Sequence, residues 1–325
     1  MTQVAELTII RRGFPRVVGK AAVPTLSRMV VMRILLAIAV MSFGSLALAE
    51  ENGPRLAAYE TLSLPNQAKT VTFTKRGAQR GDRVDQQVDV SLRMDSTTRR
   101  ANQPIEKSTS TIQRKQQRML VVERVVDGRT VAAQVRFGKC ERTADGETEE
   151  PPIVGKTYRC ERKEDDTLGI TRADGTLALP DEFALVAESM HALGRPNPLA
   201  DYLDGKSVRT GQKLEVPKEL GDSLLSGDGA LGSVSKFELT LKGVDPTTRV
   251  ANFAIEILSE GAETTQMKLM VHGTLDIEID TCRTRKLQFG GPLGMATTTG
   301  SYSASQTTFV SGTLKMEMSA NYTDR

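Results

Sequence analysis

The sequence has little of what aromatic and metal-dependent sites need. Its 325 residues contain no tryptophan, two histidines and three cysteines, and aromatic residues make up 4% of the chain. So few rings leave little for the stacking platforms of nucleic-acid-binding proteins or for the aromatic girdles of outer-membrane barrels. No His-rich cluster, CxxC pair or G-x-S-x-G motif is present, so neither a metal site nor a serine hydrolase is indicated. We therefore expect no cofactor and no nucleic-acid partner.

Long apolar runs are also missing, apart from one near the start of the chain. Residues 34–43 are apolar apart from Ser42, follow Arg33, and precede the small residues Ala47 and Ala49. Ten residues of helix span about 15 Å, which is too short for a bilayer core of about 30 Å. A basic residue, a short apolar run and an A-x-A-like site are typical of a secretory signal peptide. We predict that residues 1–49 are a leader cleaved after Ala49, which leaves no transmembrane segment in the mature chain.

The residues before this run have two interpretations. Translation starts at Met29 or Met32, or the segment is an extended basic n-region in which Arg11-Arg12 resembles a twin-arginine export signal. The first 49 residues hold six Lys and Arg and one Glu, so their removal takes the formal net charge from +3 to about −2. The mature protein, residues 50–325, is thus expected to be near neutral and exported to the periplasm or the medium.

Two patterns in the sequence resemble those of enzymes. Residues 227–232 match G-x-G-x-x-G, but helical residues come before them and a strand pattern after, the reverse of a dinucleotide site. The carboxylates Asp181, Glu182 and Asp201 could do acid–base work if the fold brought them together. The spacing in sequence does not show that it does, so a dispersed carboxylate site is kept as the alternative to a non-enzymatic protein.

Alternation with a period of two dominates the mature chain. Apolar residues at every second position from Met267 to Ile279 predict a long strand with one buried face, and residues 88–94, 237–241, 251–257 and 314–322 repeat the pattern. Asp127-Gly128 supplies a two-residue hairpin turn. Helical spacing replaces alternation between about 180 and 225, where we expect helices at Pro180–Leu193, 198–203 and 217–225. This order predicts an α+β domain, a curved antiparallel sheet or half-barrel with a helical insert between two sheet halves.

The order of elements loosely resembles the half-barrel periplasmic lipoprotein carriers and a group of uncharacterised exported bacterial β-rich proteins. The segments that carry the resemblance are GKTYRCERKEDDTLGITRADGTLALPDEF, LADYLDGKSVRTGQKLEV and HGTLDIEIDTCRTRKLQFGG. They contain no catalytic motif, so the resemblance implies a fold more than a function.

Whether the cysteines form a disulfide depends on the compartment of the mature protein. In an exported chain a disulfide can persist, and Cys140 and Cys160 flank a polar connection. If their strands pair as a hairpin, the two thiols could lie opposite each other and form a disulfide, which would leave Cys282 as the free thiol.

The apolar faces suggest what the protein does. One principal helix is short for covering so many long strands, so either the sheet closes on itself as a structural domain or it leaves an apolar face for a guest. We expect the guest to be an apolar small molecule, a lipid, a lipidated partner or an envelope protein. Its candidate contact residues are Leu269, Val271, Met316, Met318, Phe183 and Met190. Bulky substitution at Leu269 or Met316 is expected to weaken binding.

Overall fold

The computed structural model describes residues 69–100, 103–225, 233–261, 265–299 and 305–324. The predicted leader, its cleavage site and the G-x-G-x-x-G segment lie outside these residues. The elements follow in the order β1 (Thr70–Thr72), β2 (Arg83–Arg100), β3 (Glu106–Val126), β4 (Arg129–Ala144), β5 (Glu147–Glu149), β6 (Thr157–Arg162), β7 (Leu168–Arg172), α2 (Pro180–Met190), α3 (Pro198–Leu203), β8 (Ser207–Arg209), β9 (Lys213–Glu215), α4 (Lys218–Leu225), β10 (Ser233–Asp245), β11 (Val250–Glu260), β12 (Thr265–Glu278), β13 (Thr284–Thr299) and β14 (Gln306–Thr323).

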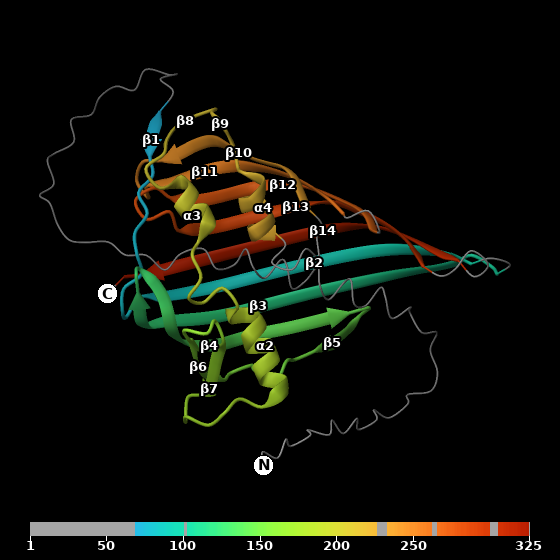
Figure 1. Cartoon of the computed structure of the whole chain (residues 1–325), viewed down its shortest axis with the longest axis horizontal. Helices are drawn as coiled ribbons and strands as arrows, with labels where there is room; N and C mark the ends of the chain where they lie inside the picture. The colour runs from blue at the N-terminus through green and yellow to red at the C-terminus, as the bar shows by residue number, and fades with distance from the viewer. Residues whose placement is uncertain (1–68, 101–102, 226–232, 262–264, 300–304, 325) are drawn as a thin grey trace, which may run out of the picture.

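Twelve of these strands form one antiparallel sheet, and β1 and β8 form a separate pair (Figure 1). The large sheet runs β7-β6-β4-β3-β2-β14-β13-β12-β11-β10-β9, with β5 paired to β4. Its two halves meet where β2 pairs with β14 over their whole length, from Arg83 opposite Thr323 to Arg100 opposite Gln306. The sheet ends at β7 and β9 and is therefore open, which confirms the predicted curved antiparallel architecture.

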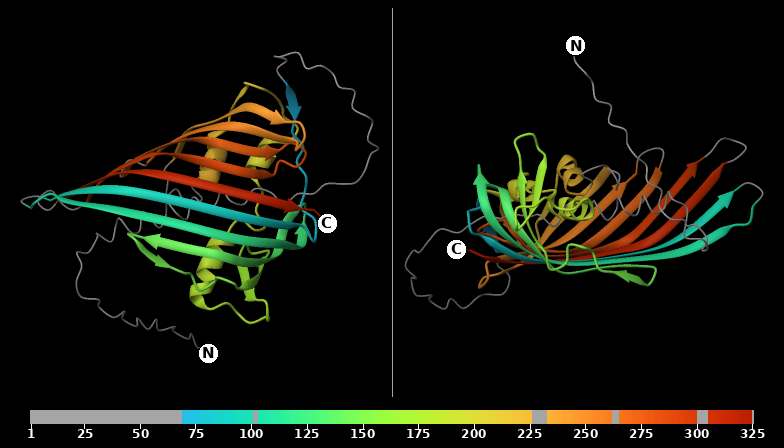
Figure 2. Two further views of the ribbon diagram at one scale, coloured as in Figure 1. Left: turned by 180° about the vertical axis from the view of Figure 1, so that it is seen from behind. Right: turned by 90° about the horizontal axis from the view of Figure 1, so that it is seen from below.

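The sheet has one buried and one wet face, as the alternation predicts. In β12, Met267, Leu269, Val271, Leu275 and Ile277 are buried, while the residues between them are mostly exposed or half-buried. The right-hand view of Figure 2 shows the sheet curving around the three helices, which lie on its inner side toward one end. We call this inner side the concave face. Burial of one side chain in two along so many strands is the main source of hydrophobic stabilisation.

The local signals for turns and helices are confirmed. Asp127 and Gly128 have φ of 49° and 70° between β3 and β4, as a two-residue hairpin turn with positive φ at both positions requires. Helix α2 begins with Pro180 in its first turn and ends at Met190, three residues earlier than expected. Asn197 caps α3 by accepting hydrogen bonds from the amides of Leu199 and Ala200.

Two apolar cores lie on the concave face. The larger joins β10–β14, β2, α3 and α4, and the smaller joins β3, β4, β6 and β7 to α2. Buried polar side chains separate the two. Gln116 Nε2 lies 3.0 Å from Ser189 Oγ, and Arg118 Nε lies 2.7 Å from Gln86 Oε1. The Arg118 guanidinium also donates to the Ser189 carbonyl, so this seam attaches the C-terminal end of α2 to β2 and β3.

The structure does not place Cys140 and Cys160 opposite each other, as a simple hairpin of their two strands would. Strands β4 and β6 do pair, but the residue opposite Cys160 is Ala133, and Cys140 faces Gln116 on β3 instead. Strand β4 pairs with β6 only from Ala132 to Arg136, and its last three residues pair with β5 instead. Cys140 lies between these two paired segments and has no partner residue on β6. All three cysteines are buried free thiols in the structure.

Candidate apolar binding site

A cavity of about 430 Å³ opens between the helices and the concave face of the sheet. Its roof comes from the α2–α3 connection, α3 and α4, including Pro196, Leu199 and Leu224. Its floor comes from four neighbouring strands, β10–β13. The large apolar side chains of the floor are Phe237, Ile255, Ile257, Leu275, Leu287 and Phe289.

The strand register brings the floor residues together. Phe237 lies opposite Ile257, and Leu275 lies opposite Leu287. Phe289 lies opposite Gly273, and a Cβ atom at Gly273 would fall 2.6 Å from the Cβ of Phe289. Glycine at this position therefore lets the β13 backbone approach β12 closely beside the floor. The floor follows from pairings between strands, so no single stretch of sequence reveals it.

The residues predicted to face a ligand are divided by the structure. Leu269, Val271, Met316 and Met318 are buried in the larger core on the concave face, but they do not line this cavity. Met316 is nevertheless opposite Phe289, one strand away from the floor. Met190, the last residue of α2, is fully buried in the smaller core. Phe183 is 41% exposed. Four of the six predicted contact residues thus lie on the concave face of the sheet, and none of the six lines the cavity.

The three carboxylates of the alternative hypothesis, Asp181, Glu182 and Asp201, differ in their surroundings. Glu182 is buried and accepts hydrogen bonds from Arg172 Nε at 3.0 Å and from Lys156 Nζ at 2.7 Å. The hydrogen bonds from Arg172, together with the one from Lys156, lower the pKa of Glu182 to about 2 in spite of its burial. Asp201 on α3 pairs with Lys75, and Asp181 is exposed. A carboxylate ionised at every working pH and tied to two cations is a structural ion pair rather than a general acid or base.

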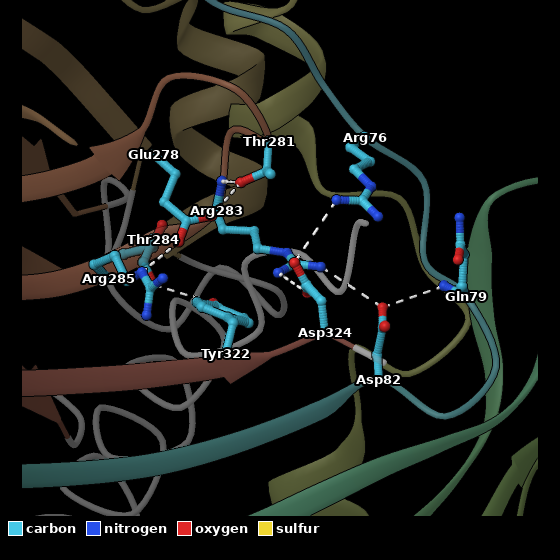
Figure 3. Close-up of polar contacts among 10 residues, drawn as sticks. All are labelled: Arg76, Gln79, Asp82, Glu278, Thr281, Arg283, Thr284, Arg285, Tyr322 and Asp324. Atoms are coloured by element: carbon cyan, nitrogen blue, oxygen red, sulfur yellow. Dashed lines mark hydrogen bonds and ion pairs between the residues drawn. The ribbon is translucent and has the colours of Figure 1, made fainter. Parts of the chain in front are cut away.

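A second group of buried charges lies at the end of the sheet near the C-terminus (Figure 3). Arg283 and Asp82 are each 1% exposed, and their charged groups lie 3.6 Å apart. Arg283 Nη1 donates to Asp324 Oδ1 at 2.7 Å, and its guanidinium lies 4.8 Å from the centre of the Tyr322 ring. Burial raises the pKa values of both Asp82 and Tyr322. We call this group the Arg283 cluster.

The composition of the Arg283 cluster indicates a structural role. It joins the segment before β2, the turn between β12 and β13, and the end of β14. Arg76 lies 3.7 Å from Asp324, and Arg285 pairs with Glu278, so its positive and negative charges balance. A balanced cluster has no surplus charge for an ion, and among the described residues no group of three His, Cys, Asp or Glu could hold a metal. Sequence reasoning missed the cluster because arginines near strand ends are ordinarily solvated.

The buried thiols lead to a test. Burial raises the pKa of Cys140, and it raises the pKa values of Cys160 and Cys282 to about 12. Because the thiolate is the reactive form, we expect a disulfide-exchange reagent at pH 8 to label the native protein slowly and the unfolded, non-reduced protein at all three cysteines. One reactive thiol in the unfolded, non-reduced protein would instead restore the Cys140–Cys160 disulfide.

Comparisons with known proteins give no family. No family model matches the chain, and no curated protein matches it. Among solved structures, lipovitellin with its lipid–protein interactions is similar at 6% identity and a TM-score of 0.34, over 73% of this chain and 25% of that one. A LolA superfamily protein from Nitrosomonas europaea is similar at 10% identity and a TM-score of 0.14, over 73% of this chain and 86% of that one. This chain thus spans a quarter of the lipovitellin chain, and neither score demonstrates a shared fold.

No helix within the described ranges is both long and apolar enough to cross a bilayer.

Proposed function

We propose that this protein is an exported, non-enzymatic binding protein that holds an apolar molecule in the cavity between its helices and the concave face of its sheet. The observation that carries the proposal is the cavity itself, about 430 Å³ with six large apolar side chains on its floor. Pockets of about 300–1,000 Å³ are typical of small-molecule sites. Atoms that line an empty apolar cavity lack dispersion partners on one side, and an apolar guest restores those contacts.

The proposed place of action rests on the leader. A basic residue, a short apolar run and small residues at 47 and 49 indicate export. Outside the cytoplasm, an apolar molecule must cross an aqueous space, and a cavity that removes it from water makes that transfer favourable. The wet outer face of the sheet, polar along β2 and β14, suits a protein that carries its guest through water.

Filling the cavity tests the proposal. We expect Ile257→Phe and Leu275→Phe, alone and combined, to weaken the binding of an environment-sensitive apolar dye by about tenfold, equivalent to about 1.4 kcal/mol, because the added rings occupy the guest's space. The measurement is a fluorescence titration of the folded protein, with native mass spectrometry for a co-purified lipid. Ala254→Leu is the matched control, since Ala254 lies on the same strand as Ile257 and belongs to the opposite face.

The same experiment can reject the proposal. If the dye stays dark on folded wild-type protein and no lipid co-purifies, the cavity is not a binding site and the protein is a structural domain that takes no apolar guest. If Ala254→Leu weakens binding as much as the cavity substitutions do, the dye binds elsewhere on the surface.

A further inference from the structure

Most of the polar groups of the cavity lie on its roof. Besides apolar residues, the cavity is lined by His191, Arg195 and Asn197 from the α2–α3 connection, and by Ser223 and Thr284. Of the described residues that line it, none is an aspartate or a glutamate. An arginine is charged at any pH of interest. The cavity therefore combines an apolar floor with a positive charge on one side of its roof.

Arg195 is the roof group best suited to an ionic ligand. The Asn197 side chain already caps α3, with its Oδ1 3.2 Å from the amide of Leu199. His191 Nδ1 lies 3.0 Å from the Glu188 carbonyl, and burial, aided by Arg195 and other arginines, lowers the pKa of this histidine. The imidazole is thus mainly neutral at pH 7. Among these polar groups the lasting charge belongs to Arg195.

The surroundings of Arg195 leave that charge incompletely balanced. Its Nη2 lies 3.2 Å from Asp166 Oδ2, but the same carboxylate also lies 3.7 Å from Arg162 Nε. Two guanidinium groups therefore share one carboxylate. Asp166 is 67% exposed, so solvent screens its pairing with Arg195, whose side chain is 51% exposed. The Arg162 side chain is mostly buried and is occupied in binding the carbonyls at the end of α2.

We propose that the ligand is a single-chain amphiphile with a carboxylate headgroup, its chain against the floor and its carboxylate on Arg195. This inference rests on the proposed function and names the ligand class for the same cavity. A guanidinium matches a carboxylate geometrically through two parallel hydrogen bonds. The volume, about 430 Å³, is roughly three times that of the ~150 Å³ cavities that bind benzene, which suits one aliphatic chain.

The test compares two probes that share one chain. Oleate and oleyl alcohol differ only in the headgroup, and both are titrated below their aggregation limits by displacement of the apolar dye. We expect wild-type protein to bind oleate about tenfold more tightly than the alcohol, because a hydrogen bond to a charged group is stronger than one to a neutral group. Arg195→Gln should remove this preference and leave binding of the alcohol unchanged, whereas Arg195→Lys should retain part of it.

A matched control separates a specific contact from general surface charge. Arg93→Gln removes one positive charge from an exposed position on β2, outside the cavity lining, and should leave the oleate preference intact. Wild-type protein that binds both probes equally, or an Arg195→Gln variant that keeps the full preference, would overturn the inference while leaving the proposed function standing. Failure of both probes and of the dye to bind would instead reject the proposed function.

Discussion

Replacing Gly291 by alanine should destabilise the protein by about 3 kcal/mol or more. An alanine Cβ at this position would fall 1.9 Å from the carbonyl oxygen of Met270 and 3.0 Å from the Cα of Val271 on the neighbouring strand. These are backbone atoms, so no rotamer change can relieve the overlap, and β12 and β13 must separate. Overpacking a well-packed core costs about 1–3 kcal/mol when side chains can adjust, and more when the backbone has to move. Urea unfolding followed by circular dichroism measures the change.

Gly294 is the matched control for this prediction. It lies on the same strand, and nothing comes within 4 Å of a Cβ built there. Alanine restricts the unfolded chain more than glycine does, so Gly294→Ala should be neutral or stabilising by up to about 1 kcal/mol. The two substitutions are chemically identical, and only the distance to the next strand differs. Equal stabilities of the two variants would show that β12 and β13 do not approach as the structure has them.

Much of the fold could be predicted from the sequence because one-sided burial leaves a periodic record. The alternation from Met267 to Ile279 corresponds to β12, and Asp127-Gly128 corresponds to a hairpin turn. The signals for the helices are equally local, because a proline such as Pro180 favours the first turn of a helix whatever that helix packs against. Each of these signals depends on residues within a few positions of each other, which is why they survive without knowledge of the tertiary structure.

The cavity could not be predicted, because it depends on where the helices lie along the strands. Alternation shows that Ile255, Leu275 and Leu269 belong to buried faces. It does not distinguish a position that is packed within the core from one that lines a cavity. The first two line the cavity, and the third is packed within the core. Strand register has the same limit. Cys160 lies opposite Ala133, far along β4 from Cys140, and no local pattern encodes that pairing.

One buried charge did leave a signal in the sequence. Arg118 has the same parity along β3 as Leu120 and Val122, so the alternation that buries them also places Arg118 on the concave face. Burial lowers its pKa to about 9. A charged residue that occupies a position where the alternation predicts a buried apolar residue thus indicates a buried polar network.

Arg283→Met should be comparably damaging, with an expected cost of about 3–5 kcal/mol at pH 7. Arg283 is 1% exposed and is the nearest cation to the equally buried Asp82 in the Arg283 cluster (Figure 3). Removing one member of a buried pair leaves the other as a desolvated charge with reduced compensation, which is why such losses exceed those of surface pairs. Arg285→Met is the control. Arg285 is 36% exposed and pairs with Glu278, so its loss should cost about 1 kcal/mol or less.

The pH dependence identifies Asp82 as the source of the penalty. Burial already raises the pKa of Asp82 in the wild type, and the charge of Arg283 opposes that rise, so Arg283→Met should raise it further. The pKa of an aspartate in the unfolded state is about 3.9. An aspartate whose pKa is higher than this in the folded state destabilises the fold when it is ionised and no longer does so once it is protonated. The stability difference between wild type and Arg283→Met should therefore be largest at neutral pH and shrink as pH falls toward 4.

A double variant completes the test. In Arg283→Met/Asp82→Asn the buried carboxylate is gone, so the double variant should be more stable than the sum of the two single effects predicts, and its difference from the wild type should vary less with pH. Strict additivity of the two substitutions, or a difference between wild type and Arg283→Met that is constant from pH 7 to pH 4, would show that Arg283 acts through its packing on Tyr322 rather than through the charge of Asp82. Unfolding free energies of all four proteins across that pH range decide between the two.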